Sequence, residues 1–258
     1  MTASDARNAV RDRWVEQHRR LGFPDPPRRV DIEPAGLARR VEDLSTRIVI
    51  LPADPRVARL EFDDEMWEWW TEQRSAPFGA QLSWHKSFPT VDAAVHLRGT
   101  ADEWDTYLAV NRHGGVEVGT SDIYTIREAR CFRLVRTVGL LWVALDTQSQ
   151  VLRHVPAEGP WQVALALHNT QGAVLGDLAE GWASPGRGLV RVRVCPEPHI
   201  VIREELTEWP AQEKADEIRR LAFRLGGRIE DAWGVKQRRF LANGGELEGG
   251  FDPRSWRL

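Results

Sequence analysis

Two pairs of polar residues in this 258-residue sequence stand where ligand-contacting groups often occur. His168 and Asn169 close an apolar segment that precedes a glycine-rich stretch, and loops after strands often carry binding residues on α/β scaffolds. His113 and Glu117 flank a turn between two alternating segments. We therefore treat these four residues as candidate ligand-binding residues. The alternative is a strand end whose polar groups are already hydrogen-bonded, or a solvated turn.

Standard catalytic motifs are missing from the sequence. There is no G-x-x-x-x-G-K-[ST] phosphate loop, no H-E-x-x-H, no C-x-x-C and no G-x-S-x-G, and no two of the seven histidines are two or four residues apart. We expect no catalytic residue, metal site or cofactor. An alternative is a metal-dependent nuclease or hydrolase that uses Glu204, Asp231 and Lys236, although their spacing matches no strict motif. Alternation places Arg203 and Glu205 on one strand face, where they can form cross-strand pairs.

Basic residues concentrate in the C-terminal part of a chain whose net charge is −3 and whose cations are 32 Arg and 3 Lys. With nearby aromatic rings, this tail could hold a phosphate backbone. The candidate nucleic-acid-binding residues are Arg224, Arg228, Lys236, Arg238 and Arg239, and Arg219 and Arg220 stand beside them. Acidic residues interleave with them, so a solvated amphipathic helix is the competing interpretation.

Three of the twelve tryptophans lie in the segment DDEMWEWWTEQ at 63–73. Helical spacing places Met66, Trp69 and Trp70 on one buried stripe, with Trp67 at its edge. The pattern predicts core packing for two rings. Trp67 and Trp233 are our candidate partner-binding residues. The alternative is an aromatic cage for a cation, for which Glu65, Glu68 and Glu72 would supply the acids.

Hydrophobic periodicity predicts strands and helices in mixed order. Strands are expected at 47–51, 57–62, 93–98, 161–169, 189–194 and 199–206, with a hairpin over 104–122 whose turn uses positive φ at Gly114 and Gly115. Both faces of 161–169 are apolar or alanine-rich, which indicates a strand covered on both sides. Helices are expected at 5–20, 35–46, 62–73 and 129–155, and in a tail helix that begins near Pro210 and is capped by Gly226 and Gly227.

These elements predict an α+β fold with a mixed or antiparallel sheet, a long central helix and packed N- and C-terminal helices. We divide the chain into a mainly helical region at 1–75 and an α+β domain at 76–258, with one continuous domain as the alternative. The longest apolar run, VGLLWVAL, is too short to cross a bilayer, and the N-terminal segment lacks the apolar core of a secretory signal. Only Cys131 and Cys195 are present, so we expect a cytoplasmic protein without a disulfide framework.

Three longer segments carry a resemblance to a known family. YLAVNRHGGVEVG, GPWQVALALHNTQGAVLGDLAEGW and IVIREELTEWP with AFRLGGRIEDAWGVKQRRFLA resemble the C-terminal region of large bacterial proteins that begin with a Schlafen-type, AlbA-like domain. Those proteins are described as ATP-, DNA- or RNA-binding. The likeness covers about residues 105–242, and residues 1–104 contain no counterpart of the AlbA-like domain, so no catalytic residue is carried over. The resemblance implies a sensor, scaffold or partner-binding unit.

The sequence thus predicts a non-catalytic binding or regulatory module that acts through a protein partner, in a bacterial defence or signalling complex. Its Trp and Arg residues would supply the contacts, because interfaces favour these side chains. A nucleic-acid-binding protein that uses the basic C-terminal helices is the first alternative. A metal-dependent nuclease or hydrolase is the second.

Overall fold

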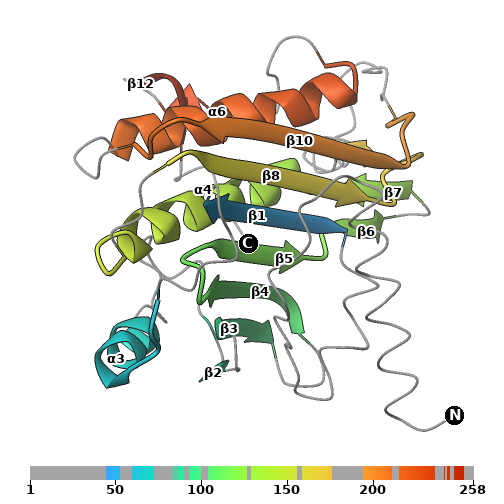
Figure 1. Ribbon diagram of the computed structural model, residues 1–258. Helices are drawn as coiled ribbons and strands as arrows, with labels where there is room; N and C mark the ends of the chain where they lie inside the picture. The colour runs from blue at the N-terminus through green and yellow to red at the C-terminus, as the bar shows by residue number, and fades with distance from the viewer. Residues whose placement is uncertain are drawn as a thin grey trace, which may run out of the picture.

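The computed structural model combines a large antiparallel sheet with three helices in the residues that it describes (Figure 1). The described residues are 45–52, 60–72, 84, 86–89, 93–99, 104–126, 129–155, 159–175, 194–210, 215–235, 241, 243–244 and 247–252. Their helices are α3 (Asp64–Glu72), α4 (Leu134–Val151) and α6 (Ala215–Ala232). None of these helices is long and apolar enough to span a membrane.

Seven strands form the main sheet in the order β10-β8-β1-β5-β4-β3-β2, and every pairing is antiparallel. They are β1 (Thr46–Pro52), β2 (Lys86–Pro89), β3 (Ala93–Gly99), β4 (Trp104–Asn111), β5 (Val116–Thr120), β8 (Trp161–His168) and β10 (His199–Leu206). The strands predicted at 47–51, 93–98, 161–169 and 199–206 and the predicted hairpin are confirmed. Residues 60–62, the described end of the strand predicted at 57–62, lie in no strand.

Smaller strands complete the described part of the fold. A three-stranded sheet and a two-stranded hairpin contain β6 (Ile123–Ile126), β7 (Ala129–Phe132), β9 (Val174–Leu175), β11 (Asn243–Gly244) and β12 (Leu247–Phe251). The β7 strand corrects the prediction of one helix over 129–155, because the first four residues of that segment pair with β6 and β9 and α4 begins at Leu134. A three-to-four spacing of apolar residues does not separate a short strand from the helix that follows it.

Both faces of the main sheet are buried at its central strands β1 and β8. Ile48 and Leu165 belong to the main core on the face where α4 packs against β1 and β5 and α6 packs against β10. Val49 and Ala164 lie on the opposite face and are also buried, in a separate apolar cluster. The prediction that the strand at 161–169 is covered on both sides is therefore confirmed.

Gly115 and Gly226 are needed because other groups approach them closely, and not for the turn and the helix cap that the sequence predicted. Gly114 has the expected φ of 79°, whereas Gly115 is required by space, because a Cβ there would lie 2.5 Å from the carbonyl oxygen of Ile50. Gly226 does not end the tail helix, which continues to Ala232. A Cβ on Gly226 would lie 2.6 Å from Val138 Cγ2, so this glycine allows α6 to approach α4 closely.

The N-terminal predictions fall mostly outside the described residues. The helices expected at 5–20 and 35–46 precede or barely reach the first described residue, Ser45. The β1 strand lies between β5 and β8 at the centre of the sheet, so residues 46–52 share one sheet with strands from the later part of the chain. The separate helical region predicted at 1–75 stays a prediction for the residues before Ser45.

Candidate functional site

The two predicted ligand-binding pairs lie at opposite ends of the main sheet. Thr46 pairs with Leu167, which places His168 and Asn169 beside the start of β1. The turn that contains His113 follows β4 at the other end, where β5 begins opposite Ile50. His168 is buried, and Asn169 is exposed with a φ of 56°. The structure therefore does not bring the two pairs into one site.

Glu117 occupies the sheet interior instead of a solvated turn. Its carboxylate accepts hydrogen bonds from Arg47 Nε at 2.7 Å and from Arg47 Nη2 at 2.9 Å, and it also accepts one from the Tyr107 hydroxyl. The side chains of Arg47 and Glu117 are 4% and 3% exposed. The prediction of a ligand-binding residue beside the turn missed this bidentate ion pair, because its two members come from strands that lie far apart in the sequence.

Burial and charge act together in this Arg47–Glu117–Tyr107 triad. Burial alone would lower the pKa of Arg47, but the adjacent Glu117 carboxylate and the Tyr107 side chain together more than offset this, so the pKa of Arg47 is raised. Burial, and then the Glu117 carboxylate, raise the pKa of Tyr107 well above its usual value. Arg47 therefore stays charged and Tyr107 stays protonated, which makes the triad a fixed connection between β1, β4 and β5.

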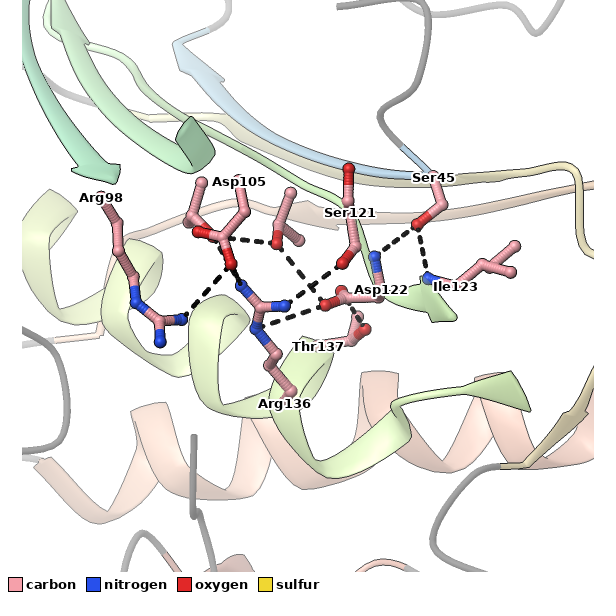
Figure 2. A network of polar contacts seen from close by, with 10 residues as sticks. Ser45, Arg98, Asp105, Ser121, Asp122, Ile123, Arg136 and Thr137 are labelled. Atoms are coloured by element: carbon pink, nitrogen blue, oxygen red, sulfur yellow. Dashed lines mark hydrogen bonds and ion pairs between the residues drawn. The ribbon is translucent and has the colours of Figure 1, made fainter. Parts of the chain in front are cut away.

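A second polar network ties the start of α4 to the main sheet (Figure 2). Arg136 is buried, and its guanidinium donates to Asp105 Oδ2 at 2.9 Å and to Thr106 Oγ1 at 2.7 Å. On its other side, Arg136 Nε lies 3.6 Å from Asp122 Oδ1, and Asp122 Oδ2 accepts a hydrogen bond from Thr137 Oγ1 at 2.5 Å. Two carboxylates thus share one arginine at the N-terminal turn of α4.

The surroundings of Asp122 indicate a structural role. Its backbone N–H donates to Ser45 Oγ at 2.6 Å, so the residue also connects to the chain just before β1. Burial raises the pKa of Asp122, although the Arg136 charge and neighbouring hydroxyls oppose this shift. Arg98 reaches the outer side of the network and lies 3.7 Å from Asp105 Oδ2. The network therefore fixes where α4 begins, and the sequence contained no local motif for it.

Acidification is expected to destabilise the protein through His168. Burial, and then the charges of His199 and Arg47, lower the pKa of His168 to about 4 from its ordinary value near 6.5. The unfolded chain binds a proton as the pH falls below about 6.5, whereas the folded chain does not until about pH 4, so stability is lost across that window. The loss due to this group is at most about 3 kcal/mol. Urea unfolding between pH 7 and pH 4.5 measures it.

The matched variants for this experiment are His168→Gln and His199→Gln. The two rings lie 5.7 Å apart, but His199 is exposed whereas His168 is buried. His168→Gln should flatten the fall in unfolding free energy between pH 6.5 and pH 4.5, and His199→Gln should leave most of it. An unchanged slope in His168→Gln would show that another group causes the loss.

Two of the five predicted nucleic-acid-binding residues form ion pairs in the structure, and the other three lie outside the described residues. Arg224 lies 2.8 Å and Arg228 lies 3.5 Å from the Glu204 carboxylate, whereas Lys236, Arg238 and Arg239 fall outside the described residues. The Glu204 carboxylate is therefore bound by two arginines. In the alternative nuclease site, the same carboxylate would bind a metal ion together with Asp231 and Lys236. Across the described ranges, no group of three or more His, Cys, Asp or Glu residues is arranged to hold a metal ion.

The two predicted partner-binding tryptophans differ in exposure. Trp67 is partly buried at the edge of the main core, as its position in the helix predicted. Trp233 is 2% exposed, its Nε1 donates to the Ala173 carbonyl at 2.8 Å, and its ring stacks on Phe132. The ring of Trp233 therefore lies inside the core of the folded chain, where it is not accessible to a partner, and the contact proposed for it stays a prediction.

The backbone of β10 faces away from the sheet at alternate residues. The His168 N–H donates to the Ser45 carbonyl, so the backbone N–H and C=O of His168 point toward β1 and away from β10. In an antiparallel ladder, the N–H and C=O of one residue point to the same side and alternate along the strand. The register then directs Leu165 toward Ile202 on β10. The β10 residues whose backbone N–H and C=O groups point outward, away from β8, are His199, Val201, Arg203 and Glu205.

A contact from α6 supports this assignment. Arg228 Nη1 donates to the Arg203 carbonyl oxygen at 2.7 Å, as expected for a carbonyl directed away from β8. Within the described ranges, no strand pairs with this side of β10. Sheet edges of this kind readily pair with another strand, and charged side chains often protect them. We call the outward-facing backbone of residues 199–206 the β10 edge.

Three exposed arginines run along α6 near the β10 edge. Arg220, Arg224 and Arg228 are spaced four residues apart, so they lie on one side of the helix. Figure 1 shows α6 alongside β10 at the end of the sheet. The contacts of Arg224 and Arg228 with Glu204 show that the row borders the strand. We call these three residues the arginine row.

Comparisons with known proteins provide no further assignment. The resemblance to the region that follows the AlbA-like domain stays a prediction that rests on the quoted segments. No family model, no curated protein and no solved structure matched this chain.

Proposed function

We propose that this chain is a protein-binding regulatory module that pairs an extended segment of a partner protein with the β10 edge. One observation carries the proposal: β10 is an eight-residue strand that ends the seven-stranded sheet and directs alternate backbone groups outward. Partner strands commonly add to such edges, where main-chain hydrogen bonds supply affinity and side chains supply specificity.

The side chains of the β10 edge suit a polar interface. His199, Arg203 and Glu205 are exposed, and Val201 is partly buried beside the apolar cluster on the same face of the sheet. A partner strand would add one strand to the sheet, and its side chains on this face would lie beside Val201 and beside the charged Arg203 and Glu205. The resemblance to an accessory region of larger bacterial proteins supports the same proposal, a unit that acts beside another protein in a cytoplasmic defence or signalling complex.

Val201→Pro is the first test, because it removes an outward N–H and no bond to β8. Binding of the partner should fall at least tenfold, whereas the midpoint of thermal unfolding should change by only a few degrees. Val201→Thr keeps the N–H and is the matched control, which should retain binding. Quantitative affinity purification from the native host, followed by calorimetry with each purified candidate, measures the effect. Equal binding of every candidate by Val201→Pro and by the unmodified chain would contradict the proposal.

A nucleic-acid-binding function is the second candidate, and the exposed arginine row favours it. Arg224 and Arg228 already contact Glu204, which reduces the charge available to a phosphate backbone. This function predicts an affinity for single-stranded DNA or RNA that falls steeply with salt, and that Val201→Pro leaves unchanged. Fluorescence anisotropy between 50 and 200 mM salt separates the two candidates, as do the effects of the proline variant.

A further inference from the structure

We infer that the partner segment at the β10 edge carries acidic side chains at alternate positions, on the face that meets the arginine row. This inference rests on the proposed function and specifies the chemistry of the partner. Its basis is the contacts of Arg224 and Arg228 with β10, together with the helical spacing that places Arg220 on the same side of α6.

The spacing of the arginine row matches that of a strand. Residues four apart on a helix are separated by about 6 Å along its axis, because each residue rises about 1.5 Å. Alternate residues of a strand are separated by about 6.7 Å and point to the same face. Three arginines at this repeat can therefore meet three alternate side chains of an extended segment that runs beside α6.

Glu204 shows that a strand carboxylate reaches the row. It lies on β10 itself, and its two oxygens contact Arg224 at 2.8 Å and Arg228 at 3.5 Å. A partner strand would lie about 4.8 Å beyond β10, and its inward-facing side chains would pass under the same helix face. Carboxylates at those positions can form the same charge-assisted hydrogen bonds.

The charges near the row favour an acidic occupant. The row contributes three positive charges, and Glu204 shows that a carboxylate binds to two of its members. An acidic segment would be attracted to these guanidinium groups, whereas a basic segment would be repelled. Nucleic acid would also meet the charge, but it has no peptide backbone to pair with the outward N–H and C=O groups of Val201 and Glu205.

Arg228 would change partners when the segment binds. In the structure its guanidinium donates to the Arg203 carbonyl, an outward acceptor of the β10 edge. The N–H of an added strand would compete for that oxygen, and the released guanidinium would then meet a carboxylate of the same strand. Arg228 thus covers an outward carbonyl of the β10 edge, and its release favours a strand that carries an acid at the corresponding position.

Synthetic peptides test the inference on the full chain. The probe is an acetylated and amidated peptide of nine residues in which Glu alternates with Thr and Val. One control replaces every Glu by Gln, and a second has the same composition with the Glu residues in one block. NMR titration should detect binding of the alternating Glu peptide, and the Gln and block peptides should bind at least tenfold more weakly.

Variants then assign the site. Arg220→Gln should weaken binding of the alternating Glu peptide about threefold to fivefold, as expected for a partly exposed ion pair. It should leave the affinity for the Gln peptide unchanged. Arg112→Gln, in the turn after β4 across the sheet, is the matched control and should have no effect. Val201→Pro should abolish binding of both peptides, because it acts on the backbone.

The possible failures are distinct. If the Glu and Gln peptides bind equally, or if neither binds, while Val201→Pro still abolishes binding of the natural partner, the acidic specificity is wrong and the proposed function stands. If Val201→Pro leaves the natural partner bound, the proposed function falls and this inference falls with it. If oligo(dT) displaces the Glu peptide and binds more tightly whether or not Val201 is replaced, the arginine row belongs to a nucleic-acid site and the inference is overturned.

Discussion

Glu117→Gln is expected to lower the free energy of unfolding by about 3–5 kcal/mol, because it leaves the Arg47 guanidinium charged and incompletely paired in the sheet interior. The two side chains are 4% and 3% exposed, and two hydrogen bonds of 2.7 and 2.9 Å join them. Urea unfolding at pH 7 measures the change. A loss below about 1 kcal/mol would show that solvent or a rearrangement compensates the arginine.

A double variant separates the loss of a partner from the value of the pair. Arg47→Met combined with Glu117→Leu removes both charges and keeps apolar volume in the sheet. Its unfolding free energy should lie well above that of Glu117→Gln, because replacement of a whole buried ion pair by apolar residues is often neutral or stabilising. Tyr107→Phe is a milder control, since it removes one hydroxyl that donates to Glu117. A double variant as unstable as the single one would contradict this explanation.

Trp70→Ala is expected to lower the free energy of unfolding by about 3–5 kcal/mol, the range for large aromatic residues removed from a core. Trp70 is 0% exposed, and its ring stacks on His96 with centroids 3.9 Å apart and planes 7° apart. Trp67→Ala is the control from the same helix, because its ring is only partly buried at the core edge. It should cost about 1 kcal/mol, the centre of the distribution for point variants.

Chemical denaturation at one pH measures both tryptophan variants. Equal losses would mean that the helix does not divide its rings between the core and the edge. The sequence interpretation of this cluster depends on that division, since it assigned core packing to Trp69 and Trp70 and a contact role to Trp67. The structure buries Trp70 fully but Trp69 only partly, and it leaves the role of Trp67 open to partner-binding experiments.

Local patterns allowed most strands of the main sheet to be predicted, but not the short strands outside it. Alternation in WQVALALH requires a strand with two apolar faces, and this strand lies inside the sheet with both faces buried. The pair Gly114–Gly115 marked the hairpin turn correctly, although only Gly114 needs a left-handed backbone. Signals of this kind lie within a few residues, so one sequence is enough to detect them.

The site could not be predicted in the same way, because its contacts join distant segments. Arg47 and Glu117 are 70 residues apart, and each looks like an isolated charge beside a turn or at a strand end. The one local signal of this interior pair is a charged residue, Arg47, in phase with the apolar residues Val49 and Leu51 of the same strand. The sequence placed Arg203 and Glu205 on one face of a strand. It could not reveal that this strand ends the sheet, because strand order depends on pairings across the whole chain.

The central place of β1 has a consequence for biosynthesis. Among the described strands, β1 is translated before both of its neighbours in the sheet, β5 and β8, and Thr46 pairs with Thr120 and with Leu167. Until β5 is translated β1 has neither of these partners, one of its sides stays unpaired until β8 follows, and pairings of such long range form slowly. We expect co-translational folding of this protein to pass through an incomplete sheet until β8 has been translated.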